Sequence, residues 1–174
     1  MQRTFFNLLH DLHDLGVARS GGMTETAAMP PPQSVTVSVE IDAPIWRVYQ
    51  NWKRLERFPT FVPTVKEARW LSKKQLYWRE AHDGEEYIST FEVIVNPATT
   101  SLRWRSLTGP QSSGTATCEP LRDGRSRLTL QIDFVEDEKI QSTAAVRKRH
   151  LDFLLGFKRF VEAMPAGRRP AITK

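Results

Sequence analysis

Apolar and polar residues alternate along most of the middle of the chain, which is the pattern of β-strands with one buried face. The segment 34–41 alternates strictly, with valine or isoleucine at every second position. Six further segments have strand character, at about 65–71, 75–82, 86–95, 101–107, 113–121 and 126–136. Asp-Gly pairs at 83–84 and 123–124 are strong hairpin signals, so we expect neighbouring strands to pair antiparallel.

Helical periodicity flanks this series of strands. Pro44 suits the first turn of a short helix that carries Trp46 and Trp52, and Asp42 is a suitable N-cap for it. A long helix is predicted at about 138–164, with an apolar face at a spacing of 100° per residue. That face consists of Val146, His150, Phe153, Leu154, Phe157, Phe160, Val161 and Met164. The sequence therefore predicts an α+β fold, in which a curved seven-stranded antiparallel sheet wraps around the long C-terminal helix.

The segment RLERFPTFVPTV, residues 54–65, fits neither pattern. Pro59 and Pro63 exclude a long helix, and the alternation is too poor for a strand. Phe58 and Phe61 must therefore lie in a short helical turn or a loop. This turn would be the second of two short helices after the first strand.

The order of these elements resembles the START-like (SRPBCC) superfamily, in particular its bacterial polyketide cyclase/dehydrase and coenzyme Q-binding-like branch. The resemblance covers residues 34–163 and rests on six segments in the same order. These are EIDAPIWRVYQNW, RLERFPTFVPTVKEARWL, LYWRE, LRWRSLTGPQSSGTATCEPL with its Trp104, Ser106 and Gly114, SRLTLQIDFVED and LLGFKRFVE. The resemblance implies a helix-grip fold with a ligand cavity between the sheet and the C-terminal helix. Residues 1–33 would then form an N-terminal extension and residues 164–174 a basic tail.

We predict that this cavity binds a hydrophobic small molecule or lipid, such as an isoprenoid quinone or a polyketide, without a cofactor. Strand alternation, helical facing and the resemblance together select ten ligand-binding candidates. They are Trp52, Phe58, Phe61, Trp78, Trp104, Ser106, Phe134, His150, Leu154 and Phe157. For Phe58 and Phe61 two interpretations stay open, because rings that close a cavity and rings that fill a core are of the same residue type.

An enzymatic alternative depends on polar residues at inward positions. Alternation places Glu80 and His82 on the inward face of their strand, and His150 lies on the apolar face of the helix. If the three converge, they could perform the acid/base steps of a cyclase or dehydratase. In the other interpretation His82 lies at a wet rim beside its hairpin, and Glu80 pairs with an arginine. The candidate arginines are Arg79, Arg103 and Arg105.

Composition narrows the function classes. A chain of 174 residues with 40% hydrophobic residues suits one domain with a real core. The net charge of +5 does not indicate a nucleic-acid-binding protein, because the excess lies largely at 147–149 and in the tail. The single cysteine, Cys118, excludes an internal disulfide and is expected to be buried, so a reducing cytoplasm is the expected location.

The N-terminal extension carries a further alternative, a membrane-docked lipid or quinone chaperone with peripheral membrane contact. Apolar residues recur at helical spacing between Phe5 and Leu15, but the polar face carries Asp and His rather than Lys and Arg. His10 and His13 lie one turn apart without a third ligand, so no metal site is predicted. Met23 is an alternative start of the chain.

Overall fold

The computed structural model describes residues 32–82, 84–135 and 142–165. The described residues form strands, two α-helices (α1 and α2) and two short 3₁₀ helices (η1 and η2). The elements are β1 (Pro32–Ile41), α1 (Ile45–Trp52), η1 (Leu55–Thr60), β2 (Val65–Trp70), β3 (Gln75–His82), β4 (Glu85–Asn96), β5 (Ser101–Thr108), β6 (Ser112–Pro120), η2 (Arg122–Gly124), β7 (Ser126–Val135) and α2 (Thr143–Glu162). The amphipathic helix expected near the N-terminus, the His10–His13 pair and the basic tail lie outside the described residues.

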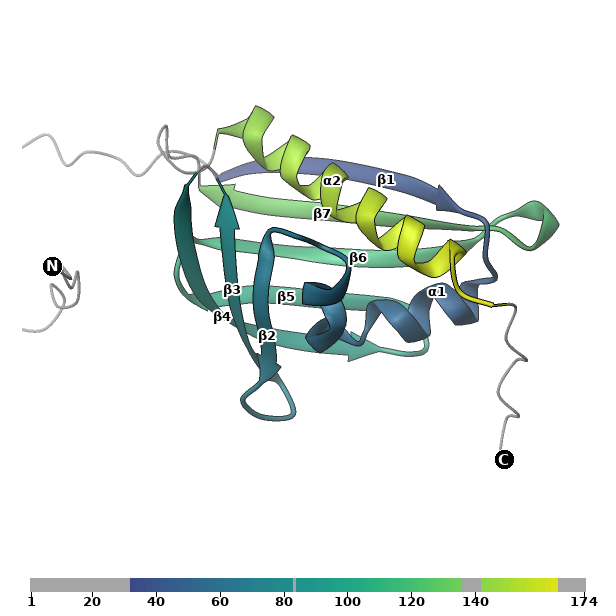
Figure 1. Cartoon of the computed structure of the whole chain (residues 1–174), viewed down its shortest axis with the longest axis horizontal. Coiled ribbons are helices and arrows are strands. Elements are labelled where there is room, and N and C mark those ends of the chain that lie inside the picture. Colours follow the sequence, from purple (N-terminus) through teal and green to yellow (C-terminus); the bar gives the residue numbers. More distant parts are fainter. Residues whose placement is uncertain (1–31, 83, 136–141, 166–174) are drawn as a thin grey trace, which may run out of the picture.

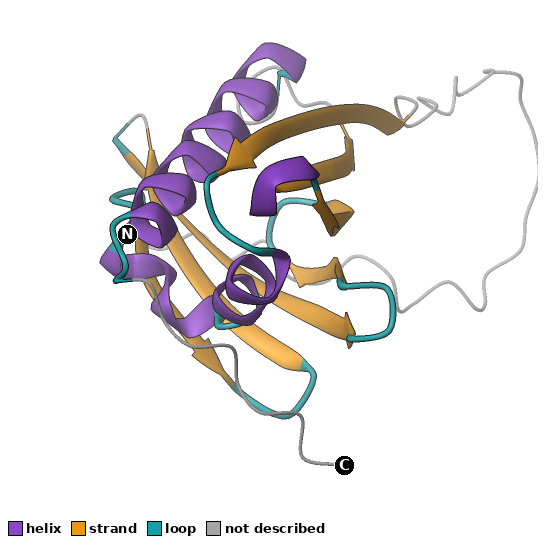
Figure 2. Ribbon diagram, turned by 90° about the vertical axis from the view of Figure 1, so that its right-hand side faces the viewer, coloured by secondary structure: helices purple, strands orange, loops and turns teal. Residues whose placement is uncertain are grey.

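The strands form one seven-stranded sheet in the order β1-β7-β6-β5-β4-β3-β2. Every neighbouring pair is antiparallel. Figure 1 shows α2 crossing the sheet, and the turned view in Figure 2 shows the strands bending around it. The predicted α+β helix-grip architecture is therefore confirmed, including the two short helices after the first strand.

Both Asp-Gly turns occur where the sequence predicts them. His82 pairs with Glu85 across a two-residue turn, in which Gly84 has φ +81°. At the second turn, Asp123 and Gly124 have φ values of 63° and 76°. This left-handed region of backbone conformation favours glycine and tolerates aspartate, so the local sequence suffices to specify both hairpins.

The start of α1 differs from the expectation. Pro44, not Asp42, occupies the N-cap position, with an extended backbone at φ −69° and ψ 148°. The amide of Asp42 instead donates to Oε1 of Glu162 at 2.7 Å, which ties this loop to the end of α2. A long-range partner thus determines how the chain enters α1.

The start of α2 is also later than predicted. The helix begins at Thr143 rather than at about 138, because Ser142 caps it: its Oγ accepts a hydrogen bond from the amide of Ala145 at 3.3 Å. The helix ends at Glu162. At the other end of the domain, β1 begins at Pro32, two residues inside the predicted extension.

An aromatic cluster fills the space between η1, α1 and α2. Phe58 has no exposed surface, and its ring lies 4.9 Å from that of Phe153 and 5.2 Å from that of Trp52. Phe61 stacks on Phe160, with ring centroids 4.3 Å apart. The segment 54–65 therefore supplies Phe58 as a central residue of the core and places Phe61 nearer the surface.

Candidate functional site

A cavity of about 130 Å³ lies between the concave face of the sheet and α2. Its wall follows the strand alternation, since every second residue of β3 and β4 contributes to it. The lining residues are Trp52, Leu55, Leu76, Trp78, Glu80, His82, Tyr87, Ser89, Phe91, Val93, Leu102, Trp104, Pro110, Ser112, Ile132, Arg149, His150 and Phe153.

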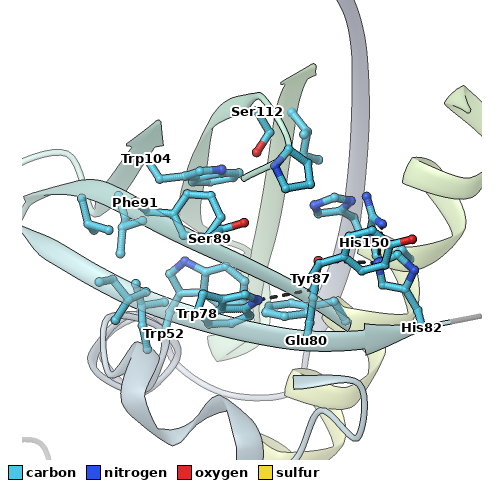
Figure 3. Close-up of a pocket in the computed structure, with 18 residues that line it drawn as sticks. Trp52, Trp78, Glu80, His82, Tyr87, Ser89, Phe91, Trp104, Ser112 and His150 are labelled. Atoms are coloured by element: carbon cyan, nitrogen blue, oxygen red, sulfur yellow. Dashed lines mark hydrogen bonds and ion pairs between the residues drawn. The ribbon is translucent and has the colours of Figure 1, made fainter. Parts of the chain in front are cut away.

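Most of the wall is apolar and rich in rings. Figure 3 shows Trp104 and Phe91 on one side of the cavity and Trp52 and Trp78 on the other. The ring of Phe153, from α2, lies 5.9 Å from that of Trp78. Walls of this kind remove apolar ligand surface from water and offer π-faces to a planar ligand.

Polar groups gather at one end of the cavity. Figure 3 shows Glu80, His82, Tyr87 and His150 together there. The rings of His82 and Tyr87 stack with centroids 4.3 Å apart. Glu80 lies between Trp78 and His82: its Oε2 accepts from Nε1 of Trp78 at 3.4 Å, and its Oε1 is 3.7 Å from Nε2 of His82.

Arg149 contributes a positive charge to this end. Its Nη1 lies 3.0 Å from Nε2 of His82, and because a guanidinium can only donate, Nε2 of His82 accepts this hydrogen bond. Among the residues that the structure describes, no carboxylate lies within ion-pair distance of Arg149. The guanidinium therefore keeps most of its donors available to a ligand in the cavity.

His150 presents a hydrogen-bond acceptor to the site. Its Nδ1 is 2.8 Å from the carbonyl oxygen of Val146, which can only accept, so the ring carries a proton on Nδ1. Burial lowers the pKa of His150; the Val146 carbonyl and Glu80 oppose this, and the Arg149 charge adds to it. The neutral ring then leaves a lone pair on Nε2, for which the described residues provide no partner.

The lowered pKa of His150 predicts a specific acid sensitivity. As the pH falls, the unfolded chain takes up this proton first, because its histidine has the ordinary value of 6.5. His150 thus contributes stability that is present above this value and is lost as the pH falls through the lower folded-state pKa. Between about pH 7.5 and about pH 5, we expect the urea midpoint of His150→Gln to fall less than that of the parent.

The comparison between the two proteins removes the contribution of the carboxylates, which titrate in both. Equal losses of the urea midpoint in the two proteins would show that His150 is protonated as easily in the folded state as in the unfolded chain.

The structure brings six of the predicted site residues to the cavity. Four are ligand-binding candidates and two are the catalytic candidates: Trp52, Trp78, Trp104, His150, Glu80 and His82. Pairing of Glu80 with an arginine is one of the two interpretations, and the described residues contain no ion pair between Glu80 and Arg79, Arg103 or Arg105. Arg79 instead contacts Glu67 and Glu86, and Arg105 contacts Glu92.

The other six candidates do not line this cavity. Phe58, Leu154 and Phe157 are fully buried in the core, and Phe61 packs on Phe160. Ser106 and Phe134 border a separate, shallow depression. Ser106 lies next to a register shift between β4 and β5, and its Oγ accepts from the amide of Ser112 at 3.0 Å. The structure therefore does not place these six residues in the wall of this cavity.

Sequence reasoning missed the contribution of β4 and of Arg149. Tyr87, Ser89, Phe91 and Val93 occupy alternate positions of β4, so the signal that selected the inward face of β3 was present there too. Arg149 gave no such signal, because it belongs to the basic run 147–149 that resembles a solvated helix face. Only its position on the folded helix reveals its role in the wall.

A reactive cysteine, a metal site and a membrane-spanning helix find no support among the described residues. Cys118 is buried, and burial raises the pKa of its thiol to about 12, so it is a small apolar core residue as predicted. The described residues contain no group of three or more His, Cys, Asp or Glu side chains that could hold a metal ion. A search of the same residues finds no helix long and apolar enough to span a membrane.

Comparisons with known proteins agree with this architecture. The Zhui aromatase/cyclase from Streptomyces sp. R1128 is similar in structure, with a TM-score of 0.68 and 18% identity over 76% of this chain and 94% of that chain. A START superfamily protein from Mycobacterium smegmatis has a TM-score of 0.62 and 19% identity over 74% of this chain and 94% of that chain. At such identities these likenesses show the shared START-like fold alone.

Sequence comparison extends the relationship beyond the fold. An uncharacterized 17.2 kDa protein of Streptomyces lincolnensis, from the melC2-rnhH intergenic region, is 25% identical over 133 residues, which are 74% of this chain and 89% of that protein. The model of the family described as polyketide cyclase/dehydrase and lipid transport matches residues 41–151, more than half of the chain. The chain therefore belongs to the polyketide cyclase/dehydrase and lipid transport family.

Proposed function

We propose that the protein binds a hydrophobic small molecule in the cavity between the sheet and α2. The observation that carries this proposal is the composition of the cavity wall, which is mostly apolar and aromatic and has its charged groups at the end that holds Arg149 and His150. Such a cavity favours a ligand with an apolar body and a polar group at one end. Desolvation of the body supplies the affinity, and the polar end sets the orientation.

The first test is mass spectrometry on an organic extract of the purified full chain. A stoichiometric apolar compound, absent from an unrelated protein prepared in the same way, is the expected result. A cavity-filling variant, Val93→Phe, should lose the compound, since Val93 lines the cavity and is only 3% exposed.

Its matched control is Ile94→Phe, the next residue on β4, which is 51% exposed. This variant adds a ring to the outer face of the sheet and should retain the compound. If Val93→Phe retains the compound as fully as Ile94→Phe does, binding in this cavity is wrong. Thermal unfolding of both variants confirms that the comparison is made on folded protein.

A second function, that of a polyketide cyclase or dehydratase, is favoured by the state of His150. Its Nε2 could accept a proton from a carbon next to a carbonyl, while the C–H electron pair moves to the carbonyl oxygen to form an enolate. Arg149 would stabilise the negative enolate oxygen, and Glu80 would support the protonated ring of His150. The family description names both catalysis and lipid transport, so it fits either function.

Turnover of a synthetic poly-β-keto thioester separates this function from binding alone. His150→Gln should lower turnover by about 10²–10⁴-fold if the imidazole is the base. Turnover that is equal in the parent, His150→Gln and Glu80→Gln would remove the catalytic function and leave the binding function in place.

A further inference from the structure

The volume of the cavity restricts the choice of ligand more strongly than the chemistry of the cavity wall does. An apolar cavity of about 150 Å³ accommodates benzene. The cavity here, at about 130 Å³, has room for one six-membered ring and its substituents. Because protein interiors are close-packed, a second fused ring that stays inside the cavity requires displacement of wall side chains such as Trp78 or Phe153.

The charges at the polar end specify the substituents. Arg149 lines the cavity, donates to His82 and has no carboxylate partner among the described residues. An arginine in this situation suits a carboxylate, which can accept two parallel hydrogen bonds from the guanidinium. The carboxylate of Glu80 faces Trp78 and His82, so it does not occupy this place.

The hydrogen-bond acceptors near Arg149 indicate a second polar substituent on the ligand. Nε2 of His150 carries a lone pair without a partner in the described chain, and Glu80 is itself an acceptor. A ligand hydroxyl placed here can donate to one of these acceptors, in place of the water that would otherwise hydrate it. The ring walls of Trp78, Trp104 and Phe153 favour an aromatic body over an aliphatic one.

We propose that the ligand is a single-ring aromatic acid with a hydroxyl substituent, a hydroxybenzoate in its simplest form. Its ring lies between Trp104 and Trp78, its carboxylate accepts from Arg149, and its hydroxyl donates to Nε2 of His150. This inference rests on the proposed binding function and assigns the chemical class of the ligand.

Isothermal titration calorimetry on the full chain tests the proposal with defined probes. These are the three hydroxybenzoate isomers, phenol, 6-hydroxy-2-naphthoate and decanoate. We expect the best hydroxybenzoate to bind at least about tenfold more tightly than phenol, which lacks the carboxylate. It should exceed the two-ring and long-chain acids by a similar factor, because these do not fit the cavity.

Arg149→Gln should weaken hydroxybenzoate binding by about tenfold to a hundredfold, the loss expected for a charge-assisted hydrogen bond. The matched control is Arg159→Gln, a change to an exposed arginine ten residues further along the same helix, which should bind as the parent does. Equal binding by Arg149→Gln and the parent would overturn the role of Arg149.

The remaining outcomes separate this inference from the proposed function. Tighter binding of the naphthoate or of decanoate would overturn the single-ring assignment while supporting a hydrophobic ligand in the cavity. If none of the six probes binds to folded protein from which any co-purified ligand has been removed, the assignment of the ligand as a single-ring aromatic acid is wrong. If Val93→Phe also leaves the composition of the organic extract unchanged, the proposed binding function fails with it.

Discussion

Replacing Phe58 with alanine should destabilise the protein by about 3–5 kcal/mol, the cost of removing a fully buried phenylalanine. The ring of Phe58 is central to the aromatic cluster and has no exposed surface. It contacts Trp52, Phe153 and Phe157, with centroid distances of 5.2, 4.9 and 6.1 Å. The void left by the ring cannot close without moving α1 or α2, because both helices pack on it.

Urea denaturation with linear extrapolation measures this loss, and Phe61→Ala provides the comparison. Phe61 is only partly buried, so its removal should cost clearly less than that of Phe58. This pair of variants also distinguishes the two interpretations of the segment 54–65. A residue that closes the cavity would alter ligand binding with little loss of stability, and that result for Phe58 would contradict its assignment to the core.

Replacing Gly114 with alanine should destabilise the protein by about 3 kcal/mol, the upper part of the usual range for an overpacked site. Gly114 pairs with Trp104 on β5 and with Ile132 on β7, in the middle of the sheet. A Cβ here would overlap the carbonyl oxygen of Gln131 and would lie 2.5 Å from Cζ2 of Trp104. The overlap with the Gln131 carbonyl can be relieved only by a shift of the paired backbones of β6 and β7, and the overlap with Trp104 by a shift of the indole.

The displaced indole should also change the cavity, because Trp104 is part of its wall. We therefore expect Gly114→Ala to lower both the urea midpoint and the affinity for the cavity ligand. Gly156→Ala is the matched control: its Cβ would lie 3.0 Å from the carbonyl oxygen of Phe61, a milder contact, and the gain in helix propensity of about 1 kcal/mol opposes it. A loss at Gly114 no larger than that at Gly156 would show that the sheet accommodates the methyl group.

Gly114 also explains part of the sequence pattern. The tryptophan of β5 and the glycine of β6 lie directly opposite each other, and the indole covers the position that a side chain would occupy. The block from Trp104 to Gly114, which supports the family resemblance, is therefore a cross-strand packing unit. Its physical role is to place a flat ring against the sheet on the cavity side.

Much of the sheet could be predicted from the sequence because its determinants are local. Alternation has a period of two residues, and a turn with positive φ requires glycine or a residue such as aspartate. These signals specified the strands, both Asp-Gly hairpins and the inward positions of Trp78, Glu80 and His82. The same alternation in β4 would have identified Tyr87 and Phe91.

The helix positions could not be divided between core and cavity in the same way. His150, Phe153, Leu154 and Phe157 share one apolar face of α2, yet only His150 and Phe153 line the cavity. Helical periodicity gives the direction of a side chain around its own axis. It does not give the point at which α1 and η1 begin to cover that face, which depends on packing between distant segments.

The sequence alone therefore determined the fold class, the approximate strand boundaries and the family of this protein, because each depends on patterns within a few residues or on their order. The tertiary structure decided the size of the cavity, the exclusion of Phe58 and Phe157 from its wall, and the meeting of Arg149 and His150 with Glu80 and His82. These features arise where α2, at its crossing over the sheet, faces β3 and β4 across the cavity. The angle at which α2 crosses the sheet, and its distance from the sheet, are properties of the packed core as a whole.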